Sequence, residues 1–85
     1  MRLPVIKHVV AFIEQNDEDY VNETIETLEH LIDAPGITDE ELDAIGEILS
    51  NLSGALDVSR EIKQGKPKRE ALNEFMERVT GSIDK

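Results

Sequence analysis

The sequence predicts an all-α protein: a small bundle of three to four helices with a central buried helix at about residues 39–64. Three observations support this fold class. Apolar residues recur every three to four positions along most of the chain, no segment alternates like a β-strand, and Pro and Gly stand together in the turns at 33–36 and 65–67. The 85 residues are expected to form a single helical domain, 1–85, with a small hydrophobic core.

The first two helices are predicted on either side of residues 16–17. Pro4 suits a first helical turn, where a backbone N–H would have no partner, and apolar residues follow it at helical spacing up to Gln15. Asn16 or Asp17 is expected to cap the second helix, whose first turn is acidic, as the helix dipole favours. The segment 33–36, Asp-Ala-Pro-Gly, is expected to end this helix.

The central helix has the most clearly defined start. Thr38 and Glu41 have the spacing of a capping box, with Thr38 as N-cap, and Ile37 and Leu42 occupy the two positions of a hydrophobic staple. Two apolar stripes follow it. The first consists of Leu42, Ile45, Leu49, Leu52 and Leu56, and the second of Ala44, Ile48, Ala55, Val58 and Ile62. A helix that is apolar on two faces is expected to lie buried between neighbours.

Two glycines stand within the polar strip of this helix. Gly46 and Gly54 each cost about 1 kcal/mol relative to Ala. The interpretation favoured is close approach of another backbone, with a bend near Gly54 as the alternative. A two-faced helix in so short a chain also favours a homodimer. The candidate interface residues are Ile45, Gly46, Leu49, Ser50, Leu52, Gly54 and Leu56.

The last helix is predicted from a stop signal and a start signal. Gly65 is a plausible end for the central helix, and Pro67 a first-turn residue of the next one. The inner face is expected to carry Leu72, Phe75, Met76 and Val79, and the helix to end at Gly81.

The charges are strongly polarised. Between His8 and Ser59 there is no Lys or Arg, but there are fourteen Asp and Glu residues, and the net charge is −10. The candidate acidic surface is Asp17, Glu18, Asp19 and Glu23; the basic cluster is Arg60, Lys63, Lys66, Lys68 and Arg69. This cluster is interpreted as favourable charge at a helix end, as a partner of the acidic surface within the chain or across a dimer, or, least favoured, as a nucleic-acid patch.

Several function classes find no support in the residues. The chain has no cysteine, so it has no disulfide, thiolate nucleophile or Cys-ligated metal. An EF-hand register from Asp17 places Asn22 and Leu28 where Gly and Glu are required, and the two histidines, His8 and His30, lack the Glu-x-x-His spacing of bundle metal sites. We expect no enzyme activity, cofactor or metal. The net charge argues against nucleic acid and membrane as partners, and the absence of a signal peptide and of a long apolar segment indicates the cytoplasm.

Two function hypotheses remain. The first is a small non-enzymatic protein-interaction module that acts as a homodimer. The alternative is an acidic regulator that binds a basic protein or mimics nucleic acid.

The chain also resembles known proteins. Its opening Leu-Pro-Val-Ile-Lys, the Asn-Asp-Glu-Asp-Tyr turn and the later Gly-Glu-Ile-Leu-Ser-Asn-Leu are similar to a family of short uncharacterised bacterial proteins. More distantly, residues 17–83 resemble the YejL-like family of small helical proteins. The matching positions are Asp17-Glu18, Val21, Ile25, Leu28, Thr38-Asp39, Leu42, Ile45-Gly46, Ser50-Asn51-Leu52, Arg69, Leu72 and Phe75. This resemblance implies an all-α fold and a homodimer with a helical interface; it implies no activity. The helix at residues 4–15 and the Gly-Lys-Pro-Lys turn are additions to that pattern.

Overall fold

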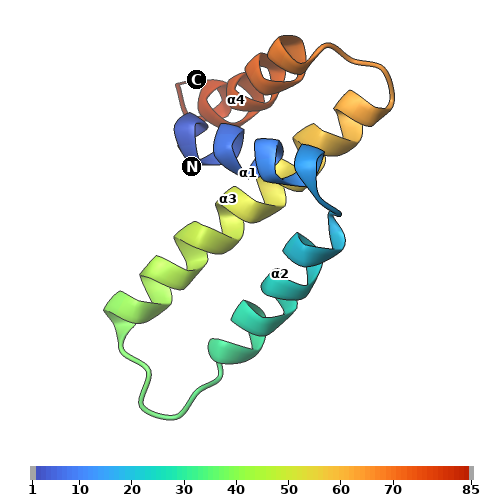
Figure 1. The fold of residues 1–85 in the computed structure, drawn as a ribbon. Helices are drawn as coiled ribbons and strands as arrows, with labels where there is room; N and C mark the ends of the chain where they lie inside the picture. The colour runs from blue at the N-terminus through green and yellow to red at the C-terminus, as the bar shows by residue number, and fades with distance from the viewer. Residues whose placement is uncertain (1, 85) are drawn as a thin grey trace.

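All the regular secondary structure of the described residues is α-helical, which confirms the predicted fold class. A computed structural model describes residues 2–84, with side chains up to residue 79. It contains four α-helices and, within those residues, no strand (Figure 1). The helices are α1 (Leu3–Gln15), α2 (Asp19–Leu31), α3 (Asp39–Lys63) and α4 (Lys68–Asp84).

The long helix α3 organises the molecule, because it contacts each of the other three. Figure 1 shows α2 running back along the N-terminal half of α3, while α1 and α4 lie across the C-terminal half. Most of the core therefore lies where α1, α3 and α4 meet. Its buried members are Ile6, Val10 and Ile13 of α1, Val21 of α2, Ala55, Leu56 and Val58 of α3, and Ala71, Leu72 and Phe75 of α4.

Local hydrogen bonds define both ends of α3. Thr38 Oγ1 accepts a hydrogen bond from the Glu41 amide at 3.1 Å, and Glu41 Oε1 accepts one from the Thr38 amide at 3.0 Å. At the other end, Gly65 has a φ of +108°, its N–H donates to Ile62, and the Lys66 N–H donates to Glu61. These are the two bonds of a Schellman motif. The predicted capping box and the predicted stop at Gly65 are thus confirmed.

Two predicted helix ends are wrong. Helix α2 begins at Asp19 with Glu18 in the cap position, while the Asp17 carboxylate accepts a hydrogen bond from the Asp19 amide at 3.2 Å. Asp17 therefore shapes the turn before the helix but is not its N-cap. Helix α4 continues through Gly81 to Asp84. A glycine costs a helix only about 1 kcal/mol, which is too little to end one without a further signal.

The two interior glycines of α3 differ in their surroundings. A Cβ on Gly54 would lie 2.6 Å from Cζ and 3.1 Å from Cε2 of Phe75, so α4 approaches α3 more closely here than a side chain would allow. This supports the packing interpretation of Gly54, but the close neighbour is the side-chain ring of Phe75 and not the predicted backbone. A Cβ on Gly46 would meet nothing within 4 Å, and α3 is continuous past both positions.

The two halves of α3 are buried to different extents. In the second apolar stripe, Ala55 and Val58 are buried under α1 and α4, but Ala44 is exposed and Ile48 is 48% exposed. The expectation that α3 is enclosed on both faces thus holds only for its C-terminal half. The physical reason is the placement of α1 and α4, which do not extend over the N-terminal half.

The resulting molecule is flat and open. Its principal extents are 43 × 36 × 17 Å, and its radius of gyration is 14.0 Å. A compact domain of this length has a radius of gyration of about 12 Å. The helices are therefore arranged more like a plate than a closed bundle.

Candidate functional site

The predicted interface residues fall into different environments. Ile45, Gly54 and Leu56 are buried within the chain, Gly54 under the ring of Phe75. The others are more open: Gly46, Leu49 and Leu52 are half-buried and Ser50 is exposed. The part of the predicted interface that is still available to a partner is therefore smaller than the sequence suggested.

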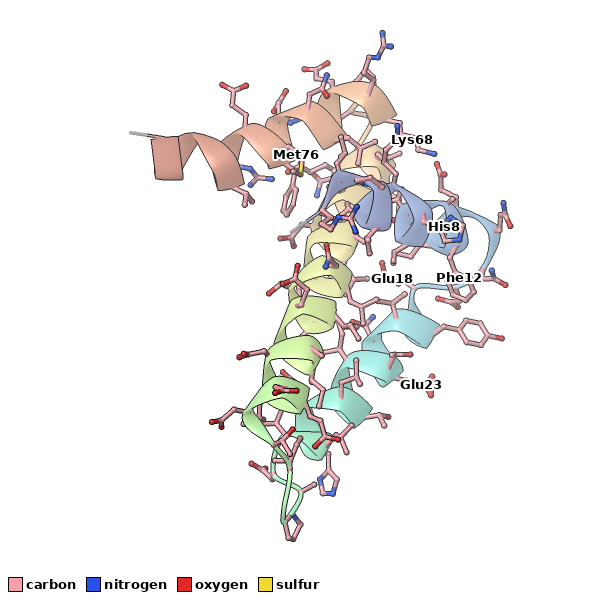
Figure 2. The ribbon with its side chains drawn as sticks, turned by 90° about the vertical axis from the view of Figure 1, so that its left-hand side faces the viewer. His8, Phe12, Glu18, Glu23, Lys68 and Met76 are labelled. Atoms are coloured by element: carbon pink, nitrogen blue, oxygen red, sulfur yellow. The ribbon has the colours of Figure 1, made fainter. Side chains whose placement is uncertain are left out.

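Two residues of the predicted acidic surface have a role within the chain. Asp17 binds the amide of Asp19, as described above. Glu18 forms an ion pair with Lys63 at 3.5 Å, which joins the start of α2 to the end of α3. Glu23 is exposed and lies one turn further along α2 (Figure 2).

Two of the five residues of the basic cluster, Lys66 and Lys68, pair with acidic residues outside the predicted acidic surface. Lys66 Nζ lies 2.7 Å from Glu74 and 3.5 Å from Glu61, and Lys68 Nζ lies 2.8 Å from Glu14 at the end of α1. The hydrogen bond between Lys66 and Glu74 raises the pKa of Lys66 and lowers that of Glu74. These pairs stabilise the α3–α4 turn and the contact of α4 with α1.

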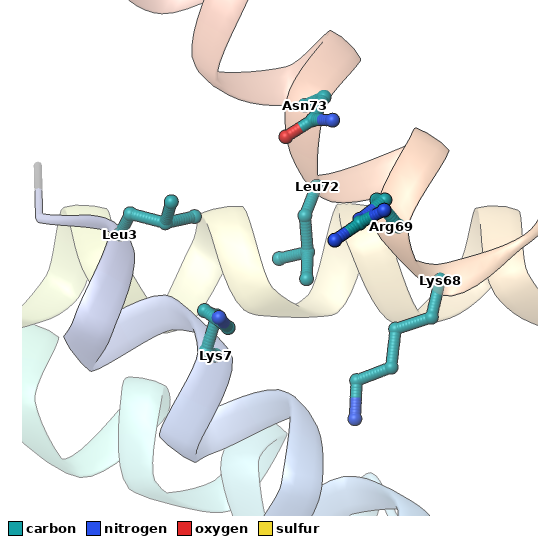
Figure 3. Close-up of a pocket in the computed structure, with 6 residues that line it drawn as sticks. All are labelled: Leu3, Lys7, Lys68, Arg69, Leu72 and Asn73. Atoms are coloured by element: carbon teal, nitrogen blue, oxygen red, sulfur yellow. The ribbon is translucent and has the colours of Figure 1, made fainter.

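A groove rimmed by cations runs between α1 and α4. It encloses about 350 Å³ and is lined by Leu3, Lys7, Lys68, Arg69, Leu72 and Asn73. Figure 3 shows the apolar side chains of Leu3 and Leu72 between the two helices, with the basic side chains around them. Lys7 and Arg69 form no ion pair with any residue from 2 to 79, although acidic residues outnumber basic ones about two to one in the sequence. We call this feature the cationic groove.

On the other side of α1 lies an apolar surface that sequence analysis did not identify. Large apolar side chains from three helices are exposed here, and no Asp, Glu, Lys or Arg belongs to the group. We define this uncharged face by Val5 and Phe12 of α1, Tyr20, Thr24 and Leu31 of α2, and Ile48 of α3. Tyr20 is 60% exposed, and its ring meets that of Phe12 edge to face at 5.8 Å. Figure 2 shows Phe12 below α1, pointing toward the first turn of α2.

Two hollows show that these residues share one side of the molecule. One hollow, of about 360 Å³, is lined by His8, Val9 and Phe12 of α1, by Tyr20, Val21 and Thr24 of α2, and by Leu52 of α3. Apart from the Tyr20 phenol, His8 is thus the one titratable side chain at this hollow, and it is counted as neutral at pH 7. The other, of about 270 Å³, is lined by Leu31 and Ile45 among others. Ile48 is one turn from both Ile45 and Leu52 on α3, so it lies between the two hollows.

The N-terminus of α1 is held against this same region. Asn51, which is 4% exposed, accepts a hydrogen bond from the Arg2 amide at 3.1 Å and donates one to the Glu47 carbonyl at 2.8 Å. Since Asn51 is one turn from Ile48, this hydrogen bond holds the first turn of α1, which carries Val5, against the segment of α3 that carries Ile48.

Most carboxylate side chains of α2 lie away from this face. Tyr20, Thr24, Thr27 and Leu31 lie within about 60° of one another around the helix. The carboxylates of Asp19, Glu26 and Glu29 point to other sides of α2, while Glu23 lies beside the stripe, about 40° from Thr27. Glu41 borders the hollow that Leu31 and Ile45 line, but its side chain is part of the capping box. The hydrogen bond from the Thr38 amide lowers the pKa of Glu41. The stripe of uncharged residues between acidic ones was a sequence signal that could have identified this face.

Other kinds of site find no support within the part of the chain that the structure describes. No group of three or more His, Asp or Glu side chains there could hold a metal ion. None of its helices is both long enough and apolar enough to cross a membrane.

The fold and its surfaces thus define a small all-α protein in which helices leave one apolar face uncovered. The chain belongs to DUF6952, a family of unknown function whose model matches residues 1–84. No curated protein and no solved structure matches the chain, and nothing links it to the YejL-like family.

Proposed function

We propose that the protein is a small non-enzymatic interaction module that acts as a homodimer. The observation that carries the proposal is the exposed area of the chain, 5,909 Å². The usual scaling of area with mass gives about 5,000 Å² for a compact monomer of 9.5 kDa. The excess is close to the roughly 800 Å² that each partner buries in a standard interface.

The location of the exposed apolar groups supports the same proposal. Of the six large apolar side chains that are exposed among the described residues, five belong to the uncharged face and Ile32 does not. Grouped apolar residues are characteristic of interaction sites. We propose the cytoplasm as the compartment, because the chain has no cysteine.

Sedimentation equilibrium tests the homodimer directly. We expect a mass of twice 9.5 kDa at micromolar concentration, with reversible dissociation on dilution. A monomer at all concentrations from 1 to about 100 μM, the range in which modest interfaces associate, would refute the proposal.

The outer side of α2 supports a second candidate function, an acidic regulator that binds a basic protein or mimics nucleic acid. Glu23, Glu26 and Glu29 are exposed and form no ion pair with any residue from 2 to 79. These three are a better test of this function than Asp17 and Glu18, which have contacts within the chain.

A pull-down from lysate at 0.05 M and 0.5 M NaCl tests this second function. A basic partner should be recovered only at low salt, because screening weakens exposed charge pairs. The same partner should be lost from the variant Glu23→Lys/Glu26→Lys/Glu29→Lys. A partner retained by that variant would contradict the acidic-regulator hypothesis.

A further inference from the structure

We propose that a second copy of this chain docks on the uncharged face, antiparallel to the first. This inference rests on the proposed homodimer and specifies which surface forms it. The face consists of Val5, Phe12, Tyr20, Thr24, Leu31 and Ile48, and the two hollows beside Ile48 and Tyr20 would receive side chains of the partner.

The absence of charge on this face favours a second copy as its occupant. Each chain has a net charge of −10, so two copies repel one another unless the surface that they bury is free of carboxylates. Burying an unpaired carboxylate would cost several kcal/mol. The carboxylates of α2 lie outside the face, and Glu41 at its edge is engaged with Thr38. Two copies can therefore meet here with one carboxylate, that of Glu41, at the edge of the contact, where it keeps its hydrogen bonds from Thr38.

The outer side of α3 offers a poorer surface for a second copy. Gly46 and Ser50 lie there together with Asp43, Glu47 and Asp57. A contact centred on Ser50 would bring these carboxylates into an interface between two negatively charged chains. We therefore place the centre of the interface at Ile48, about half a turn around α3 from Ser50, which belongs to the interface predicted from the sequence.

Charge complementarity gives the orientation of the two copies. The turn between α2 and α3 is an acidic tip that carries Asp33, Asp39, Glu40 and Asp43, none of which is ion-paired within residues 2–79. The cationic groove, with its unpaired Lys7 and Arg69, lies at the opposite end of the molecule, beside α1 (Figures 1 and 3).

A parallel arrangement would bring the two acidic tips together. In an antiparallel arrangement with twofold symmetry, each tip lies near the cationic groove of the other copy, and the complementary contact forms twice. Attraction between the acidic tip and the cationic groove then favours the same dimer as the scarcity of charge on the uncharged face.

The position of the interface is tested by two substitutions on opposite sides of one helix. Ile48 and Ser50 are about 160° apart around α3, so Ile48→Lys places a charge in the proposed interface, while Ser50→Lys adds the same charge outside it. We expect Ile48→Lys to raise the dimer dissociation constant about ten- to hundredfold, since it places a charged side chain where the proposed dimer would bury Ile48. Ser50→Lys should change it less than threefold. Tyr20→Lys provides a second test, because a side chain that is 60% exposed is not needed for folding.

The outcomes of this test are distinct from those of the proposed function. If the wild type is a monomer, the homodimer itself is refuted. If the wild type is a dimer and both Ile48→Lys and Tyr20→Lys remain dimers as tight as the wild type, with unchanged circular dichroism, then the uncharged face is not the interface. Dissociation by Ser50→Lys alone would locate the interface on the outer side of α3 and overturn the inference.

The antiparallel orientation is tested by reversing unpaired cations. Lys7→Glu/Arg69→Glu should weaken the dimer at least tenfold at 0.05 M NaCl, and less at 0.5 M NaCl because of screening. Arg60→Glu is the control, since Arg60 is an exposed cation without an ion pair in the described residues that does not line the groove. Equal effects of the Arg69→Glu and Arg60→Glu single variants would show that only net charge matters, and would overturn the antiparallel orientation.

Discussion

Replacing Gly54 with Ala tests the contact between Gly54 of α3 and the ring of Phe75 of α4. The new methyl group would lie 2.6 Å from Cζ of Phe75, a buried ring that is itself packed on α3. Inserting a methyl group into a packed site costs about 1–3 kcal/mol, whereas Ala in place of Gly stabilises a helix interior by about 1 kcal/mol. We expect a net loss of about 1 kcal/mol in the free energy of unfolding, which lowers the Tm by about 4–8 °C in a domain of this size.

Gly46→Ala is the matched control, because it makes the same change in the same helix. Nothing lies within 4 Å of the added methyl group, so only the helix propensity changes and the variant should be about 1 kcal/mol more stable than the wild type. Urea denaturation followed by circular dichroism, at one protein concentration for all variants, measures both free energies. The change in the free energy of unfolding should therefore have opposite signs for Gly54→Ala and Gly46→Ala, although the two glycines are only eight residues apart.

A double-mutant cycle links the loss to the ring of Phe75. In a Phe75→Leu background the shorter side chain leaves room for the methyl group, so Gly54→Ala should become neutral or stabilising. If Gly54→Ala is at least as stable as the wild type, or if its cost is the same in both backgrounds, the proposed clash with Phe75 is wrong.

Three further predictions concern hydrogen bonds and an ion pair. Thr38→Ala should lower stability by about 1 kcal/mol in urea denaturation at pH 7, since it removes the cap of α3; Glu41→Gln should also be destabilising there. Because the pKa of Glu41 is lowered in the folded state, its contribution is complete above the unfolded-state pKa and is lost as the pH falls through the folded-state value, so the wild type and Glu41→Gln should become equally stable in acid. Asn51→Ala should cost about 1–2 kcal/mol and accelerate hydrogen exchange at the start of α1, because Asn51 Oδ1 accepts a hydrogen bond from the amide of Arg2, the N-cap of α1; unchanged exchange there would contradict this role. Glu74→Gln should destabilise the protein at 0.05 M NaCl but much less at 1 M, because salt screens the exposed pair with Lys66; a loss independent of salt would exclude an electrostatic origin.

The local parts of the fold could be predicted because their causes lie within a few residues of sequence. Thr38 and Glu41 satisfy each other's backbone amides three positions apart, and Gly65 has the positive φ that ends α3. The errors were also local. At Asp17 the side chain bonds two residues ahead, in a turn, rather than capping the helix, and at Gly81 one weak signal did not end α4.

The candidate site could be predicted only in part, because exposure is decided by helices distant in sequence. The apolar pattern correctly marked Ile45, Leu56 and Ile48 as non-polar positions of one helix. It could not show that α1 and α4 cover only the C-terminal half of α3, which buries Leu56 and leaves Ile48 open. The ion pair of Glu18 with Lys63 likewise joins residues 45 positions apart.

The sequence by itself determined the all-α class and the ends of the central helix, because short-range hydrogen bonds and apolar spacing specify these features. It limited the number of helices to three or four. Only the tertiary structure decided which glycine is a contact, which cations are paired and which apolar residues remain exposed. These three features depend on where a second helix lies. In a flat molecule of this size, a face is buried if one further helix covers it and is exposed if none does.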